Sequence, residues 1–376
     1  MLKKYRFRDF RIRLVAYILV LSFIGILAIG SANASFQAKQ VIGVIGGTIL
    51  MLIVSVIDYE YFVKYSRLFY LLAVLLLAVV LVAGQNVNGA TRWIMIGGEG
   101  GIQFQPSEFA KIFLIIFFSA FLMKYRETLN TWKTLLMAII LFAVPAALIF
   151  KEPNLSTTII TGLIFVTLLF IAGLSYKIIL GVLAVCIPAG ILGIVLIVKD
   201  ILPIHDYQRN RVMAWIDPSQ YSDNAYQTQY SIRAIGSGRL WGKGLYNHSV
   251  LSVKNGHFIS EPQTDFIYAV IGEEMGFIGC VIILILLALI VVECIMVARN
   301  AKNLSGRLIA CGVAGWVGFQ TFVNISVATG LMPNTGVPLP FVSYGLTSLV
   351  SLFIAMGIVL NIGLQARRYG KGDVLE

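Results

Sequence analysis

Charged residues are scarce in this chain, and their scarcity excludes two broad classes of protein. Only 12% of the 376 residues are Asp, Glu, Lys or Arg, whereas 58% are hydrophobic. Ordinary soluble domains carry about 25% charged residues, and disordered chains lack apolar residues. The composition therefore indicates a protein that lies in a membrane.

Cysteine is also rare, and its spacing argues against metal or redox chemistry. The four cysteines form no CxxC pair and no compact set of metal ligands. All of them lie inside apolar runs, where a thiol packs as a small hydrophobic group. We interpret them as packing residues: Cys186, Cys280, Cys294 and Cys311.

Long apolar runs are abundant instead. Ten of them can each cross about 30 Å of hydrocarbon as a helix, and they lack the alternation of barrel strands. They lie near residues 13–32, 39–57, 68–84, 106–123, 133–150, 156–173, 177–198, 276–298, 307–331 and 344–364. The sequence predicts an all-α polytopic membrane protein of about ten transmembrane helices, forming a single domain over residues 1–376.

The basic residues predict how the spans are oriented. Six of them precede the first span, from Lys3 to Arg13, and such a flank stays in the cytoplasm. Ten spans then place both termini in the cytoplasm and the large loop 199–264, between spans seven and eight, on the extracytoplasmic side. Segments 85–105 and 332–343 join that side. Anionic headgroups at the cytoplasmic helix ends account for most of the net charge of +11, so nucleic acid is not an expected partner.

Asp265 follows the longest polar loop and opens an apolar stretch that extends to residue 299. A carboxylate between water and hydrocarbon can have its proton affinity tuned by partial burial, as a general base requires. An ordinary helix-start residue is the alternative interpretation.

Two glycine-containing segments near this residue predict irregular backbone. Residues 265–299 as one straight helix would reach roughly 50 Å, so we expect a break at Gly272 or Gly276. Residues 265 to about 274 would then form an interfacial or cavity-lining helix, with Glu273 and Glu274 near a wet surface. Segment 330–345 carries three prolines and three glycines and is expected to dip toward the bundle.

Other predicted outer segments supply polar side chains. Arg92 could hold a phosphate, while Trp93 beside it could anchor the membrane interface. Glu108 and Lys111, spaced i, i+3, could form a structural ion pair or line a functional cavity. In segment 150–160, Pro153 and Ser156 suggest ordinary helix capping.

The large loop brings cationic side chains close to glycine-rich turns. Such turns can offer backbone N–H groups and charge to a diphosphate, although a simply solvated loop has the same composition. The residues are Arg209, Arg211, Arg233, Arg239 and Lys243.

Taken in order, these segments resemble the SEDS (shape, elongation, division and sporulation) family of bacterial cell-wall synthesis. The resemblance covers nearly the whole chain. The matching strings are GATRW at 89–93, QPSEFAK at 105–111, EPNLST at 152–157, AIGSG and GKG in the large loop, TDFIYAVIGEEMGFIG at 264–279 and TGLMPNTGVPLPFVSYG at 329–345.

The resemblance implies a peptidoglycan glycosyltransferase that polymerises lipid II, a disaccharide-pentapeptide on undecaprenyl pyrophosphate, at the outer face of the cytoplasmic membrane. Asp265 matches the family's essential loop aspartate and is expected to act as general base. Cations would stabilise the departing pyrophosphate, with Mg or Mn as a possible helper. The expected substrate-binding residues are Arg92, Trp93, Gln105, Glu108, Lys111, Arg209, Arg211, Lys243 and Ser343.

The resemblance also implies a partner, a class B penicillin-binding protein with transpeptidase activity. The string HDYQRNRV and the short tails favour the RodA-like elongation branch over the division or sporulation type. Two departures weaken the match: Asn154 and Ser156 replace the usual Asp and Gly, and Leu346 and Thr347 replace a small pair.

Two further functions compete with polymerisation. A lipid II flippase would also need polar residues in its spans, whereas a membrane scaffold has no need for Asp265 beside a cationic loop. The polar segments cluster on one predicted face rather than at the midplane, which favours catalysis at an interface.

Overall fold

A computed structural model describes residues 9–87, 90–96, 102–152, 154–199, 201, 206–246, 252, 256 and 258–365. Its elements up to the large loop are α1 (Ile12–Ala32), α2 (Ala34–Ser55), α3 (Tyr59–Lys64), α4 (Ser66–Ala83), β1 (Gln85–Val87), β2 (Ala90–Ile96), β3 (Ile102–Phe104), α5 (Pro106–Lys124), η3 (Arg126–Thr128), α6 (Trp132–Lys151), α7 (Leu155–Ile171) and α8 (Tyr176–Val198). The remaining elements are α9 (Asp206–Ile216), α10 (Ser222–Ser237), α11 (Ile267–Arg299), α12 (Leu304–Ala328) and α13 (Leu346–Leu364).

Ten of these helices coincide with the ten predicted apolar runs, which confirms the all-α class. Within the described residues, eight helices are long and apolar enough to cross a membrane, namely α1, α2, α4, α5, α6, α11, α12 and α13. Helix α7 is apolar but has only 17 residues. Helix α8 is the tenth, and the number of crossings and their orientation remain predictions.

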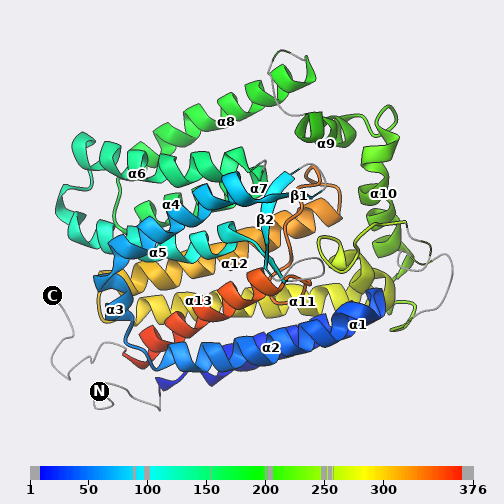
Figure 1. Cartoon of the computed structure of the whole chain (residues 1–376), viewed down its shortest axis with the longest axis horizontal. Helices are drawn as coiled ribbons and strands as arrows, with labels where there is room; N and C mark the ends of the chain where they lie inside the picture. The colour runs from blue at the N-terminus through cyan, green and yellow to red at the C-terminus, as the bar shows by residue number, and fades with distance from the viewer. Residues whose placement is uncertain are drawn as a thin grey trace.

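The long helices lie side by side along one direction (Figure 1). Helix α1 begins and α13 ends at one end of the molecule, where a Cβ on Gly363 would lie 3.5 Å from Arg11 Cγ. We call this the terminal end, and we call the opposite end, which carries α9, α10 and the start of α11, the loop end. Because the first long helix begins and the last one ends at the same end, this arrangement agrees with an even number of crossings.

Glycines allow the closest approaches in the core. A Cβ on Gly357 of α13 would lie 2.7 Å from the carbonyl oxygen of Met51 on α2, and a Cβ on Gly25 of α1 would lie 2.7 Å from that of Val342. Small residues let helix backbones approach closely in membranes. Segment 330–345 is irregular and buries Val342 and Phe341, so the predicted dip into the bundle is confirmed.

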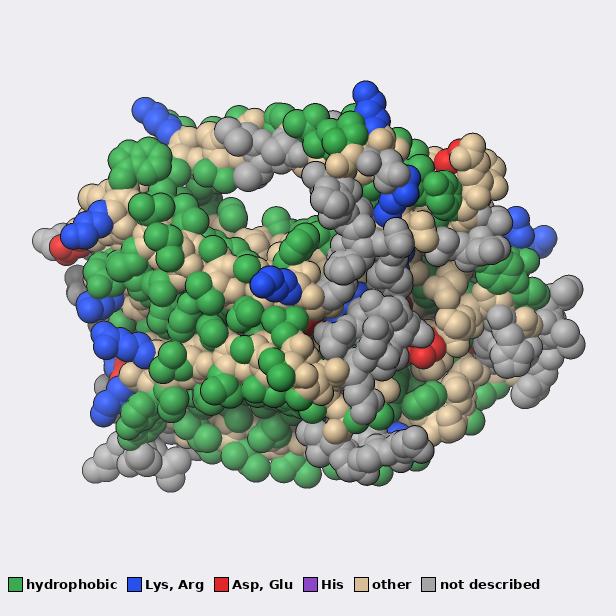
Figure 2. Space-filling view, turned by 45° about the horizontal axis from the view of Figure 1, so that its top comes forward, with side chains coloured by type: hydrophobic (Ala, Val, Ile, Leu, Met, Phe, Trp, Pro, Cys, Tyr) green, Lys and Arg blue, Asp and Glu red, His purple; other side chains and the backbone are tan. Residues whose placement is uncertain are grey.

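Helix α8 stands apart from the tightly packed helices. It lies along one edge of the bundle in Figure 1, and none of its described side chains is buried. Figure 2 shows an opening through the upper part of the molecule, with apolar side chains along part of its rim. The exposed apolar residues of helix α8 include Leu180 and Leu192.

Helix α11 is broken at Gly276, whose φ of 66° and ψ of −163° are not helical. The prediction of a break is confirmed at this glycine, whereas Gly272 lies within the helix. The break removes helical partners from nearby backbone groups, which must be satisfied in another way inside a membrane protein.

Residues 239–244 supply those partners. The backbone N–H groups of Lys243 and Gly244 donate to the carbonyls of Glu273 (2.9 Å) and Glu274 (3.0 Å). On the other side of the break, Phe277 N–H donates to the carbonyl of Arg239 at 2.8 Å. The large loop is therefore attached to α11 through main-chain hydrogen bonds.

The polar segments contain structure that the prediction of transmembrane helices did not include. Strands β1, β2 and β3 form a three-stranded antiparallel sheet in that order. The large loop contains α9 and α10. These elements are short and lie outside the long apolar runs, so the search for membrane spans could not find them.

Replacing Gly276 with Ala should destabilise the protein strongly. Its positive φ disfavours any side chain, and a Cβ would lie 2.7 Å from the carbonyl oxygen of Leu240. We expect a loss of at least about 2 kcal/mol in the free energy of unfolding, measured as a lower Tm in detergent. Gly162→Ala on α7 is the control, because its Cβ would meet nothing within 4 Å. Equal melting temperatures for the two variants would contradict this account.

Candidate active site

Three charged side chains converge beside Gly336 in segment 330–345. A Cβ at this glycine would lie 3.1 Å from Asp265 Oδ2 and 3.8 Å from both Arg211 Nη1 and Arg92 Nη1. Its φ of 68° also favours glycine over other residues. The absence of a side chain at position 336 therefore leaves space next to a carboxylate and two guanidinium groups.

Five parts of the chain position this cluster. Asp265 occupies the turn just before α11, Arg92 lies on β2, and Arg211 lies on α9. Arg211 Nη1 donates a hydrogen bond to the carbonyl of Asn334 at 3.0 Å, two residues before Gly336 in segment 330–345. Asn324 of α12 donates to the main-chain carbonyl of Asp265 at 2.9 Å.

The surroundings of Asp265 give its carboxyl group a proton affinity suited to a base. Burial raises its pKa to about 6, against the attraction of Arg211. Glu261 raises the pKa further, whereas Arg92 lowers it. The side chain still has partial access to solvent. A carboxylate that titrates near neutral pH can accept a proton and release it again.

Glu152 is a second carboxylate near Arg92, and the sequence interpretation missed it. It is fully buried between α6 and α7, and neither of its carboxylate oxygens has a hydrogen-bond partner in the described part of the chain. Burial raises its pKa to about 8, and the charge of Arg92 opposes this shift. A carboxylate at the junction of two apolar runs was the available signal, because charged residues beside hydrocarbon are costly and often functional.

Capping is confirmed in the same segment, but through a different residue. Asn154 Oδ1 accepts a hydrogen bond from Thr157 N–H at 3.3 Å and caps α7. Ser156 Oγ is buried without a hydrogen-bond partner among the described residues, and Pro153 lies outside them. Asn154 therefore retains a structural role without the negative charge of an aspartate.

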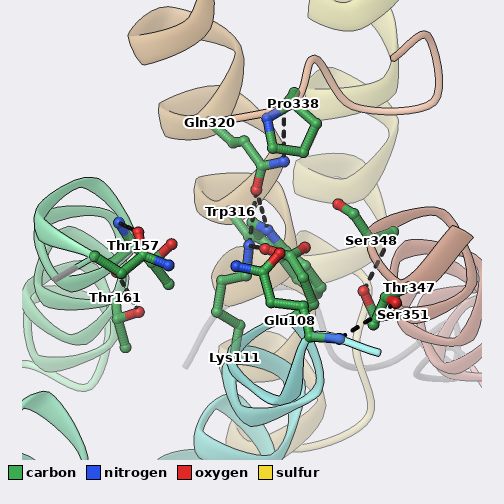
Figure 3. A network of polar contacts seen from close by, with 12 residues as sticks. Glu108, Lys111, Thr157, Thr161, Trp316, Gln320, Pro338, Thr347, Ser348 and Ser351 are labelled. Carbon is green, nitrogen blue, oxygen red and sulfur yellow. Dashed lines mark hydrogen bonds and ion pairs between the residues drawn. The ribbon is translucent and has the colours of Figure 1, made fainter. Parts of the chain in front are cut away.

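Glu108 and Lys111 form a buried ion pair of 2.7 Å inside the bundle. Lys111 Nζ also donates to Gln320 Oε1 at 2.8 Å and lies 4.6 Å from the centre of the Trp316 ring. Figure 3 shows the lysine among these groups, with Gln320 extending toward Pro338. Lys111 is only 1% exposed and is held by Glu108 and Gln320, and its role at a pyrophosphate stays a prediction.

The ion pair supports segment 330–345 instead. Gln320 Oε1 accepts from both Lys111 and Trp316 Nε1, and this fixes the orientation of its amide. Its Nε2 then donates to the carbonyl of Pro338 at 2.9 Å. The buried charge of Lys111 thus acts on segment 330–345, beside Asp265, through the uncharged side chain of Gln320.

Lys243 lies apart from the Asp265 cluster and pairs with Glu273 at 2.8 Å. Glu273 and Glu274 are each 3% exposed, so the prediction that they lie near a wet surface is wrong. Residues 239–244 cover both of them. Ser31 Oγ, from the end of α1, donates to Glu274 Oε1 at 2.7 Å.

The remaining predicted residues have local contacts. Ser343 Oγ accepts from Leu339 N–H at 2.7 Å within segment 330–345. Gln105 precedes α5, and its N–H donates to Thr347 Oγ1 at 3.4 Å. Trp93 pairs with Gln85 between β1 and β2, and Arg209 is partly buried on α9. The structure thus brings Asp265, Arg92 and Arg211 together beside Gly336.

Known proteins resemble this chain along nearly its full length. The FtsW, RodA and SpoVE family model, described as cell cycle protein, matches residues 10–368. A probable peptidoglycan glycosyltransferase FtsW from Haemophilus ducreyi is 35% identical over 83% of this chain and 77% of its own length. The stage V sporulation protein E of Bacillus subtilis is 32% identical over 94% and 97%, respectively.

Solved structures share the fold. A chain from a peptidoglycan synthase complex, whose structure concerns the coordination of polymerization and crosslinking, has a TM-score of 0.78 and 27% identity, covering 94% of this chain and 97% of the other. The rod shape determining protein RodA of Thermus thermophilus has a TM-score of 0.69 and 25% identity, covering 97% and 98%. By the extent of the family match and the identity to these relatives, this chain belongs to the FtsW, RodA and SpoVE family of cell cycle proteins, the SEDS family.

Proposed function

We propose that this multi-pass protein of the cytoplasmic membrane is a peptidoglycan glycosyltransferase that polymerises lipid II at the outer face of that membrane. The convergence of Asp265, Arg92 and Arg211 on the space beside Gly336 is the observation that carries the proposal. Relatives bearing the name peptidoglycan glycosyltransferase support the reaction class. The substrate, the catalytic roles and the membrane orientation belong to the proposal.

The chemistry requires a base for the acceptor and positive charge for the leaving group. Asp265 accepts the proton of the acceptor sugar's 4-hydroxyl as its oxygen forms a bond to C1 of the donor sugar. The bond between C1 and the pyrophosphate oxygen breaks, and the lipid pyrophosphate leaves with the electron pair. Arg92 and Arg211 stabilise that negative charge.

Metal ligands are sparse near this cluster. Across the residues that the structure describes, no three His, Cys, Asp or Glu side chains come together as metal ligands. Mg²⁺ is usually held by one or two carboxylates together with substrate phosphates, so a Mg or Mn ion shared between a carboxylate and the pyrophosphate stays a prediction.

The relatives favour the division or sporulation type over the elongation branch suggested by HDYQRNRV. The relatives above 30% identity that are reported above are named FtsW and stage V sporulation protein E, whereas RodA resembles this chain at 25% identity. Part of that string lies outside the described residues, and a few loop residues distinguish branches weakly. We therefore propose a role in division or sporulation.

The proposed partner is a class B penicillin-binding protein with transpeptidase activity. The similar synthase complex, in which polymerization is coordinated with crosslinking, supports such a partner. The transpeptidase would crosslink the new glycan strand.

Asp265→Asn should abolish polymer formation without unfolding the protein. The amide cannot accept the hydroxyl proton, although it keeps the size of the carboxylate. The measurement is glycan polymer formed from labelled lipid II by the purified protein, with and without its penicillin-binding partner. Asp217→Asn is the control, because this partly exposed aspartate caps a local turn outside the cluster. Polymerisation by the Asp265 variant would remove the base role, and lipid transfer between leaflets without any new glycosidic bond would favour a flippase.

The pH profile of polymerisation should show an acid limb near pH 6. Below this pH Asp265 is protonated, so kcat/KM should fall about tenfold per pH unit. Glu261→Gln should move the limb to lower pH, because the negative charge of Glu261 raises the pKa of Asp265. A limb that does not respond to this substitution would argue against Asp265 as the titrating group.

Glu152→Gln should stabilise the protein more at pH 8.5 than at pH 5.5. The pKa of Glu152 is about 8 in the folded state, against about 4.3 when unfolded, so wild-type stability falls as pH rises through this window. The glutamine side chain does not ionise, so the stability of the variant does not fall with pH for this reason. Melting temperatures in detergent at both pH values measure the difference, and an equal effect of the substitution at both would contradict the assignment.

A further inference from the structure

Asn324 on α12 joins two segments of the candidate active site. Its Nδ2 donates both hydrogens, one to the main-chain carbonyl of Asp265 at 2.9 Å and one to that of Val337 at 2.7 Å. The first carbonyl belongs to the turn before α11, and the second follows Gly336 directly. A single amide therefore links the residue that carries the proposed base to the segment against which its carboxylate lies.

A neighbouring amide extends this attachment along α12. Gln320 lies one helical turn before Asn324, so the two side chains occupy the same helix face. Gln320 Nε2 donates to the carbonyl of Pro338, the residue after Val337. The two amides thus hold consecutive carbonyls of segment 330–345 against α12.

Arg211 holds the same segment from α9. It donates to the carbonyl of Asn334, two residues before Gly336, while Asn324 binds one residue after it. The glycine is therefore fixed on both sides along the chain. Any shift of this segment relative to Asp265 changes the separation between the carboxylate and the guanidinium of Arg211.

The acceptor atom of Asn324 makes a purely structural explanation incomplete. The residue is 1% exposed, and its Oδ1 has no hydrogen-bond partner among the described residues. Burying an unpaired carbonyl oxygen opposes folding. The two donated bonds are thus the described polar contacts of this side chain, and both end on the segments that form the cluster.

We propose that Asn324 is a positioning residue that holds the carboxylate of Asp265 against Gly336 and the guanidinium of Arg211. This inference rests on the proposed function, in which Asp265 is the base. Displacement of a reacting group by about 1 Å can cost on the order of 100-fold in rate. Asn324 acts through the backbone of Asp265 and does not itself touch the reacting atoms.

The proposal also predicts a change in the acidity of the base. The charged groups that face Asp265 are Arg211 from α9, Arg92 from β2 and Glu261 from the preceding turn. Burial is the largest influence on its pKa. A carboxylate released from Asn324 gains access to water, so its pKa should fall toward the ordinary value and the acid limb should move to lower pH.

Asn361 provides a matched control at the terminal end. This buried amide also joins two main-chain groups, because Nδ2 donates to the carbonyl of Ser55 at 2.8 Å and Oδ1 accepts from Tyr59 N–H at 2.8 Å. Its removal deletes a comparable cross-link without touching the cluster. Asn361→Ala should lower the Tm and leave kcat and the acid limb unchanged.

The test measures kcat, KM and the pH profile of polymerisation of labelled lipid II by full-length wild type, Asn324→Ala and Asn361→Ala. For Asn324→Ala we expect kcat to fall 10- to 100-fold per folded molecule, KM to change less than about threefold, and the acid limb to move below pH 6. If the alanine variant does not fold, Asn324→Leu keeps a branched side chain of similar shape without the donors and without a new charge, and the same changes are expected.

The outcomes separate this inference from the proposed function. Wild-type kcat and an unmoved acid limb in a folded Asn324 variant would overturn the positioning role, as would a loss that matches Asn361→Ala in Tm and leaves the pH profile intact. Polymerisation by Asp265→Asn would instead overturn the base role on which the inference rests. The expected pattern combines an inactive Asp265→Asn with a slow, acid-shifted Asn324 variant.

Discussion

The attraction between one partly buried carboxylate and two guanidinium groups, in the space left by a glycine, is the interaction on which the site depends. Burial alone would drive the pKa of Asp265 upward and leave it protonated, and Arg211 and Arg92 limit that rise. The result is a pKa of about 6, which leaves the carboxylate mostly ionised at neutral pH. Gly336 matters because any side chain there would occupy the space beside the three charges.

The rest of the fold holds these groups in place from several directions. The break in α11 at Gly276 is stabilised by hydrogen bonds from residues 239–244, which attach the large loop to the bundle. The buried Glu108 and Lys111 pair acts further inside, where it orients Gln320 against segment 330–345. Irregular backbone is tolerated at this depth because protein groups satisfy its carbonyls.

The length of the apolar runs predicted ten apolar helices, because hydrocarbon thickness sets the length of a span. The excessive length of segment 265–299 also predicted a break at Gly272 or Gly276, and the structure places it at Gly276. Sequence spacing could not show which segments meet in space, so it did not reveal that Lys111 orients Gln320 toward Pro338. It also overlooked Glu152, whose segment was explained by helix capping. It likewise could not show that residues 239–244 bury Glu273, since main-chain hydrogen bonds bring them together.

A structure of the protein with bound lipid II would test the central claim most directly. The account predicts that the acceptor sugar's 4-hydroxyl lies within about 2.6 to 3.2 Å of the Asp265 carboxylate, beside Gly336. The donor pyrophosphate should contact Arg92 and Arg211. Lipid II bound with its sugars and pyrophosphate away from Gly336, for instance beside Lys243, would contradict the account.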